Sequence, residues 1–380
     1  FRRVRYDYYA TLNRLFVENF LRPIHDWCEA NKLGFTGHFW EHMWPDPGHQ
    51  PSVMYCYRWQ QVPAIDLLAF QFYPEDRERT RIMLLSCKEL GSIQRQLGKE
   101  RTLCETTGAG GYHRTLVDFK PLTDFGLIYG FDIVNQHLSH QTLVGARKYD
   151  WAQTYSDHSA WWDDYRIEAD HEARLTWALT RGKEQNRILL LQPTTTAWIY
   201  KEAGKPRGGA SQQRWDTDPS LGARKLANMR SYQCELIERM TDEQFDFDLG
   251  DECVMEEFGS VDGAKLVVGD CRYPVLVIPG ITENLRRPTV DLVEAFLQAG
   301  GSVFVLGDAP AFVDGRESSA VARLFAGHPE RCRFIPDTAE ALAALRRTVP
   351  PYIATPDGSA PPAGLAWTRR VLEDGRILHL

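Results

Sequence analysis

The stretch Arg101-Thr-Leu-Cys-Glu-Thr-Thr-Gly-Ala-Gly-Gly111 joins a short apolar run to a glutamate and then to a glycine-rich turn. Comparable apolar runs occur at 64–72, 130–135 and 187–192, and stretches with helical periodicity at 78–97, 116–127 and 167–182 separate them. Helices that alternate with continuous apolar strands predict a parallel sheet covered on both faces. The sequence therefore predicts an α/β fold.

A fifth strand predicted at 33–40 follows a long amphipathic helix at 6–31, which Pro23 should kink or divide in two. Five such units with long loops after the strands predict the C-terminal portion of a (β/α)8 TIM barrel over residues 1–205, with the earlier strands upstream of Phe1. The polar stretch 201–221 is expected to be a linker or a long surface loop.

The α/β rhythm restarts over residues 222–348, which predicts a second, doubly wound, flavodoxin-like domain. Its Cys253 and Cys271 are expected to lie outside any strand-to-helix elbow, so a nucleophilic cysteine is not predicted there. Residues 350–380 are punctuated by Pro and Gly and end in a predicted hairpin, the start of a truncated β-sandwich.

Composition narrows the function classes. The 380 residues are 43% hydrophobic and 25% charged, with a net charge of -7, which is typical of a globular protein of at least two domains. An acidic surface argues against a nucleic-acid partner. Eight scattered cysteines without a CxxC pair predict free thiols. The sequence has no run of eighteen apolar residues, so it predicts no membrane span. Its eleven Trp and fifteen Tyr residues suit stacking against sugar rings.

Two glutamates are the candidate catalytic groups. Catalytic side chains of a barrel lie at the carboxyl ends of its strands, where Glu41 and Glu105 are predicted. Glycoside cleavage needs two such carboxyl groups. Glu41 lies among His38, Trp40, His42 and Trp44, surroundings that would favour its neutral form, so it is predicted to be the general acid. Glu105 is predicted to be the nucleophile or general base, beside glycines that let backbone approach a ligand.

Other polar and aromatic residues near the predicted strand ends are candidates for binding sugar hydroxyls and rings: His38, Trp40, His42, Asn135, His137, His140, His158, Trp161 and Trp198. Asp66, inside an apolar strand, is interpreted as structural. Two alternatives remain open. A metal-dependent hydrolase would use His137, His140 and Glu105, and a decayed barrel would bind carbohydrate without cleaving it.

Several of these stretches together resemble the α-L-rhamnosidases of glycoside hydrolase family 106: His38-Phe-Trp-Glu-His42, Cys104-Glu-Thr-Thr-Gly-Ala-Gly-Gly111, Asn135-Gln-His-Leu-Ser139, Gly145-Ala-Arg-Lys-Tyr-Asp150, and Gln192-Pro-Thr-Thr-Thr-Ala-Trp198. Residues 222–348 are similar to the non-catalytic amidotransferase-like domain that follows the barrel in those enzymes and in family 42 β-galactosidases.

The resemblance implies a bacterial barrel hydrolase with two catalytic glutamates, matching Glu41 and Glu105, and a β-sandwich after residue 350. Its substrate would be a plant or microbial polysaccharide or oligosaccharide, such as an α-L-rhamnoside. The residues require no cofactor, and the resemblance allows a calcium ion near the site. A homo-oligomer is compatible with the sequence, which leaves the compartment open.

Overall fold

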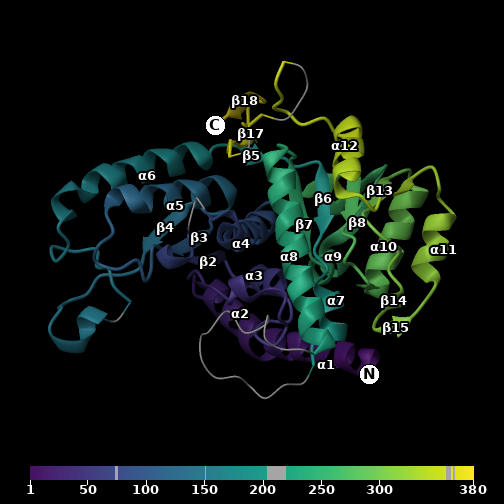
Figure 1. Cartoon of the computed structure of the whole chain (residues 1–380), viewed down its shortest axis with the longest axis horizontal. Coiled ribbons are helices and arrows are strands. Elements are labelled where there is room, and N and C mark those ends of the chain that lie inside the picture. The colour runs from purple at the N-terminus through teal and green to yellow at the C-terminus, as the bar shows by residue number, and fades with distance from the viewer. Residues whose placement is uncertain (73–75, 150, 203–219, 357–360, 363) are drawn as a thin grey trace.

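Two parallel sheets lie side by side in the chain, with helices between and around them (Figure 1). The computed structural model describes residues 1–72, 76–149, 151–202, 220–356, 361–362 and 364–380. The predicted linker at 201–221 falls almost entirely outside the described residues. The predicted α/β class with parallel sheets is confirmed.

The first sheet has four parallel strands in chain order: β1 (Thr36–Gly37), β2 (Val62–Leu67), β3 (Leu103–Thr106) and β4 (Ile133–Gln136). The helices that follow or connect these strands are α3 (Val53–Arg58), α4 (Arg77–Gln96), α5 (Leu116–Tyr129) and α6 (Tyr165–Leu179). A capping box of Thr115 and Asp118 begins α5, because each residue's side chain satisfies a free backbone N–H of the first turn. The sheet thus places three strand ends in a row.

The N-terminal helix is divided in two. α1 (Arg2–Phe16) passes through a π-helical turn at Val17–Leu21 into α2 (Arg22–Ala30). Pro23 is the second residue of α2, directly after the π-helical turn. The helix thus changes its hydrogen-bond pattern just before Pro23, where the sequence predicts a kink or a second helix.

The second sheet has five parallel strands in the order β16-β13-β11-β6-β7. They span β16 (Cys332–Phe334), β13 (Ser302–Val305), β11 (Val275–Ile278), β6 (Ile188–Leu191) and β7 (Phe247–Gly250). The expectation that the run at 187–192 continues the first sheet is wrong. β6 pairs with β11 and β7 because its four residues are all buried, as are those of its two neighbours.

Helices surround the second sheet. They are α7 (Thr194–Tyr200), α8 (Leu221–Asp242), α9 (Glu252–Phe258), α10 (Arg287–Gln298), α11 (Ala320–Ala326) and α12 (Thr338–Thr348). The Asp337 side chain caps α12, as the sequence predicts. α4 contacts both β2 and β7, so one apolar core runs through both sheets. Among the described residues, no helix combines the length and apolar character that a membrane crossing requires.

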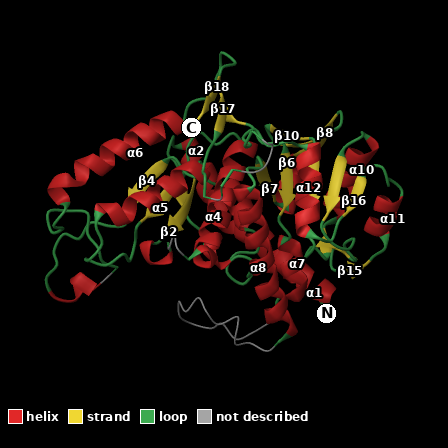
Figure 2. Cartoon of the chain, turned by 45° about the horizontal axis from the view of Figure 1, so that its top comes forward, coloured by secondary structure: helices red, strands yellow, loops and turns green. Residues whose placement is uncertain are grey.

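Smaller sheets complete the fold (Figure 2). An antiparallel sheet consists of β8 (Gly259–Asp262), β9 (Lys265–Val268) and β10 (Cys271–Tyr273). A mixed sheet consists of β12 (Asn284–Leu285), β14 (Phe312–Val313) and β15 (Arg316–Glu317), with β12 parallel and β15 antiparallel to β14. The predicted C-terminal hairpin is confirmed as β17 (Arg369–Val371) and β18 (Ile377–His379). β17 also pairs with β5 (Lys183–Glu184), which ties the chain's end to the segment before β6.

The expectation for Cys253 is wrong. β7 ends at Gly250, Asp251 caps α9, and Cys253 is in the first turn of that helix, so it does lie at a strand-to-helix turn. Its thiol is buried, and burial raises its pKa well above the ordinary value, which opposes formation of a nucleophilic thiolate.

Candidate functional site

The carboxyl edge of the first sheet carries a row of three polar side chains. Asp66 pairs in register with Glu105, and Glu105 pairs with Asn135. Each is the second-to-last residue of its strand. Because residues in register on parallel strands point to the same face of a sheet, the three side chains share that face. We call this row with His38 and His137 the edge site.

Two histidines flank the central glutamate. His38, just past β1, places Nε2 3.1 Å from Glu105 Oε2, and His137, just past β4, places Nε2 3.5 Å from Glu105 Oε1. The Glu105 side chain stays about one quarter exposed, at 28%. A carboxylate held between two imidazoles and open to solvent is available to a ligand.

The carboxyl groups of the edge site are driven toward opposite protonation states. Hydrogen bonding to Glu105 raises the pKa of His38 to about 9, and the same bond lowers the pKa of Glu105. Burial, followed by the charge of Glu41, raises the pKa of Asp66 to about 8. At neutral pH the site therefore holds a protonated Asp66 beside an ionised Glu105 and a cationic His38. This is the pattern of a paired general acid and nucleophile.

Glu41 lies beneath this edge. Its side chain is 0% exposed, in a 3-10 turn at Glu41–Met43 that follows Trp40 in the left-handed conformation. The backbone N–H of Asp66 donates to Glu41 Oε1 at 2.7 Å, and that of Phe39 donates to Oε2 at 3.2 Å. The Tyr57 hydroxyl also donates to Oε2, at 3.5 Å. Both carboxylate oxygens are thus occupied by the protein.

His38, Asp66 and Glu105 each offer one ligand atom within 4.8 Å of the others. The sequence instead grouped Glu105 with His137 and His140 as metal ligands. His140 contributes its backbone N–H to Thr154 Oγ1, at 2.8 Å. An imidazole with two carboxylates suits a transition metal, whereas Ca²⁺ prefers six to eight oxygen ligands. These three residues therefore fit the calcium ion of the resemblance poorly.

Trp161, a predicted sugar-binding residue, packs among other aromatic rings. Trp161 packs against Phe119, Tyr155 and Tyr165, and its indole N–H donates to the Arg114 carbonyl. It holds the loop after β4 together. The aromatic ring at the edge site is instead Trp151, half exposed and 6.1 Å from the His137 ring.

The remaining predicted binding residues are spread over neighbouring loops. Trp40 is half exposed, 5.4 Å from the ring of His42. His42 itself is buried, and burial lowers its pKa, which leaves it neutral. His158 Nδ1 lies 3.1 Å from Ser156 Oγ on an exposed turn. No contact with Glu105 joins these three residues to the edge site among the described residues.

The burial of Trp198 contradicts the prediction that it binds a sugar ring. Its side chain is 1% exposed, packs against Tyr6 of α1 and donates its indole N–H to the Pro51 carbonyl at 2.7 Å. A ring enclosed in this way cannot stack on a sugar. Trp198 belongs to the core that joins α1 to α7.

Sequence reasoning missed the importance of Asp66 and Trp151. Asp66 had a usable signal, because an acid near the end of an apolar strand occupies the same place as Glu105. Trp151 had none beyond its place in a loop rich in aromatics. Gly108 shows why the glycine-rich turn is required: a Cβ there would lie 2.7 Å from Leu68 Cδ2 and 3.2 Å from His137 Cγ.

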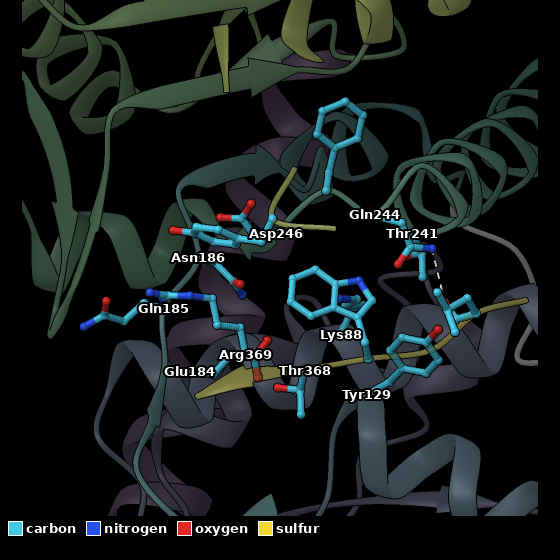
Figure 3. Close-up of a pocket in the computed structure, with 14 residues that line it drawn as sticks. Lys88, Tyr129, Glu184, Gln185, Asn186, Thr241, Gln244, Asp246, Thr368 and Arg369 are labelled. Carbon is cyan, nitrogen blue, oxygen red and sulfur yellow. Dashed lines mark hydrogen bonds between the residues drawn. The ribbon is translucent and has the colours of Figure 1, made fainter. Parts of the chain in front are cut away.

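A separate small cavity of about 30 Å³ lies where α4, the end of α8, Tyr352 and residues 365–369 meet. Figure 3 shows Lys88 beside the side chains of Tyr129, Thr368 and Arg369. Lys88 is 8% exposed, and its amine lies 4.5 Å from the Phe247 ring. Burial lowers its pKa. The cavity has room for a water-sized group and shares no lining residue with the edge site.

Comparison with known proteins gives a likeness of fold. No protein-family model matches the chain, and no curated protein does. Solved structures do. A rhamnosidase from Novosphingobium sp. PP1Y is similar over 96% of this chain and 33% of its own, with a TM-score of 0.65 and 17% identity.

Two other structures are similar at lower scores. An exo-carrageenase GH42 from Bacteroides ovatus matches 86% of this chain and 44% of its own, with a TM-score of 0.55 and 10% identity. A β-galactosidase from Rahnella sp. R3 matches 80% and 41%, with a TM-score of 0.52 and 10% identity. The chain thus spans between one third and one half of the length of these structures. All three carry names of glycoside hydrolases, and at these identities they show that the fold is shared.

Proposed function

We propose that this chain carries part of a glycoside hydrolase and that the edge site cleaves a glycosidic bond. The observation that supports this most is the pairing of Asp66 with Glu105. Burial raises the pKa of one carboxyl to about 8 and a histidine lowers the pKa of the other, on neighbouring strands in register. Glycoside cleavage needs two carboxyl groups held in these two states.

In the proposed reaction, the Glu105 carboxylate attacks the anomeric carbon. The Asp66 carboxyl gives its proton to the departing glycosidic oxygen, so the leaving sugar departs as an alcohol. Asp66, now ionised, then takes a proton from water. The resulting hydroxide displaces Glu105 from the anomeric carbon and releases the second sugar. The net change is hydrolysis, and both carboxyl groups return to their starting states.

The spacing supports retention of configuration. Carboxyl groups lie about 5–5.5 Å apart in retaining enzymes and about 6.5–9.5 Å apart in inverting ones. The ligand oxygens of Asp66 and Glu105 lie within 4.8 Å of each other, which is nearer the first class. The cationic His38 keeps Glu105 ionised for attack.

Glu41 is assigned a positioning role in place of the general-acid role expected from sequence. A general acid must touch the departing oxygen, and Glu41 is enclosed with both oxygens occupied. It binds the backbone of Phe39 and of Asp66, so it fixes the distance between the end of β1 and the end of β2. These two hydrogen bonds to Glu41 therefore hold His38 and Asp66 in position.

The proposal also assigns a role to each of the two sheets and names substrates to try first. The four strands in chain order with intervening helices suit a portion of a (β/α)8 barrel, and the five-stranded sheet suits an amidotransferase-like domain without catalytic function. The burial of Cys253 supports that second assignment. An α-L-rhamnoside or a β-galactoside is the first substrate to try, since a rhamnosidase and a β-galactosidase share the fold.

The test is hydrolysis of a panel of nitrophenyl glycosides that includes α-L-rhamnoside and β-D-galactoside. We expect release from one member, a loss of about 10²–10⁴-fold in Glu105→Gln, and no loss in Glu294→Gln, an exposed matched control on α10. Retention is checked by NMR of the first anomer released. Activity that survives Glu105→Gln would contradict the proposal.

A second candidate follows from the ligand atoms of His38, Asp66 and Glu105. If these three residues hold a transition metal, they would form a metal-dependent hydrolase site. Dialysis against a chelator separates the two candidates. Glycosidase activity by Asp66 and Glu105 should survive it, whereas metal-dependent hydrolysis should be lost and return when one equivalent of zinc is added.

A further inference from the structure

The small cavity beside Lys88 lies between α4, the end of α8 and the C-terminal segment (Figure 3). Its charged lining residues are Lys88, Glu184, Asp246 and Arg369. Its volume of about 30 Å³ exceeds the roughly 10–15 Å³ that one water needs, so it has room for about two or three water-sized groups. An occupant is therefore restricted to a single small molecule or ion.

The Lys88 amine has no hydrogen bond or ion pair with any residue that the structure describes. Its side chain is 8% exposed, and the amine lies 4.5 Å from the Phe247 ring centre and 5.5 Å from that of Tyr129. Burying an ammonium without a paired charge is costly, and burial accordingly lowers the pKa of Lys88. The cavity thus contains a buried cationic group that still lacks a counterion within the described chain.

The carboxylates around the amine are bound to arginines. Glu184 Oε2 accepts from Arg95 at 2.9 Å, and Asp246 Oδ2 accepts from Arg187 at 2.7 Å. Asp248, whose charge also acts on Lys88, accepts from Arg95 at 2.7 Å. None of the three carboxylates forms an ion pair with Lys88. The protein therefore leaves room for an external group to pair with this amine.

Cationic side chains outnumber carboxylates around the cavity. Besides Lys88, the wall contains Arg369, whose guanidinium lies 4.4 Å from the Tyr352 ring centre and forms no ion pair with a described residue. The next residue along β17, Arg370, donates to two backbone carbonyls, so its charge is not neutralised by a carboxylate at hydrogen-bond distance. An excess of positive charge favours an anion over a cation or a neutral molecule.

We propose that the cavity beside Lys88 binds one small monovalent anion of the size of chloride. The anion would pair with the Lys88 ammonium and lie in the field of Arg369. Sulfate and phosphate, with five heavy atoms each, exceed a space of about two or three water-sized groups. A bound water would fill the space but would bring no charge to offset that of Lys88. The proposal is independent of the proposed function, because the cavity and the edge site share no residue.

The test is urea denaturation with chloride replacing gluconate at constant ionic strength, since gluconate is too large for the cavity. Lys88→Met removes the ammonium and keeps a side chain of similar length. Arg369→Gln removes only the second cation. Lys99→Met is the matched control, because Lys99 is another partly buried lysine, lies outside the cavity and donates to the carbonyls of Arg58 and Gln60.

We expect 100 mM chloride to lower the unfolding equilibrium constant of the wild type about tenfold, which corresponds to a Kd of about 10 mM. The chloride effect should vanish in Lys88→Met, weaken about threefold in Arg369→Gln through the loss of a nearby charge, and persist in Lys99→Met. If circular dichroism shows that Lys88→Met fails to fold, Arg369→Gln decides. Chloride that acts no differently from gluconate overturns the proposal, as does a chloride effect that the deciding variant leaves unchanged.

Discussion

Two strands of equal length, β3 and β6, show how differently the two sheets use the same secondary structure. In β3, Leu103 and Glu105 are partly exposed while Cys104 and Thr106 are buried. All four residues of β6 are buried. One face of β3 thus opens onto the edge site, whereas both faces of β6 are in the core. The comparison indicates that a strand with one exposed face, such as β3, can supply catalytic side chains, whereas a strand buried on both faces, such as β6, contributes to stability.

The largest effect is expected from a substitution at the edge site. Asp66→Asn should lower kcat/KM about 10²–10⁴-fold, because an amide has no proton to give. At pH 7 Asp66 is protonated in the folded chain and ionised in the unfolded chain, which lowers the stability of the wild type, so Asp66→Asn should not lower the free energy of unfolding and should raise it. Steady-state kinetics and urea denaturation measure both quantities. A large loss of stability would mean that Asp66 is structural, as its sequence context alone suggests.

The pH profile sharpens the same point. Asp66 acts as an acid only while protonated, so activity should fall as pH rises through about 8. On the acid side, Glu105 must be ionised, and its lowered pKa extends activity below the ordinary glutamate value. Asp66→Glu, which keeps an acid, should retain this alkaline limb. An alkaline limb that is unchanged in Asp66→Asn would assign it to another group.

The next largest effect is a loss of stability expected from a substitution in β6, the strand that is buried on both faces. Leu190→Ala in β6 should lower the free energy of unfolding by about 2–5 kcal/mol, because Leu190 is fully buried between Val277 and Leu249. KM and kcat of the folded fraction should stay near wild type. Leu221→Ala, an exposed leucine at the start of α8, is the control and should change stability by about 0.5 kcal/mol at most. Equal effects of the two would contradict the comparison.

A smaller effect is expected in the turn after β3. Gly108→Ala adds a Cβ that would lie 2.7 Å from Leu68 Cδ2 and 3.2 Å from His137 Cγ, so both side chains must shift, and His137 is the one that contacts Glu105. We expect about tenfold lower kcat/KM, since small displacements of catalytic groups reduce rates strongly. Gly327→Ala, whose Cβ would meet only ordinary contacts at 3.4 Å, is the matched control. An unchanged rate in Gly108→Ala would show that His137 does not assist Glu105.

The smallest effect concerns the helix between the sheets. No hydrogen bond or ion pair joins the Lys88 amine to the described residues, and burial lowers its pKa. The unfolded chain therefore binds more protons than the folded one between that lowered pKa and 10.5, so stability should rise with pH over this window. Lys88→Met should remove the slope and add roughly 1 kcal/mol at pH 7, the scale of one unpaired buried polar group. Thermal melts at several pH values measure this, and a destabilised Lys88→Met would reveal a partner for the amine.

The comparison also explains what the sequence could predict. Periodicity predicts the strands β2, β3, β4 and β6 and the helices α4, α5 and α6, because burial on one face or two leaves a visible pattern of apolar residues. Periodicity does not show which sheet a strand joins, so it predicts β6 beside β4, although β6 pairs with β11 and β7. Glu105 is predictable because it follows an apolar run. The part of Asp66 in the edge site depends on its register with Glu105 and on its burial, and a linear pattern contains neither.

The placement of β6 matters for any exchange of modules between related proteins. β6 precedes Tyr200 in the chain, yet in the second sheet it lies between β11 and β7. A chimera joined between Tyr200 and Ser220 would therefore donate a sheet lacking an inner strand, and β7 would be left without its neighbour. Recombination that preserves both folds must cut before Lys183, so that β5, β6 and the C-terminal hairpin are inherited together.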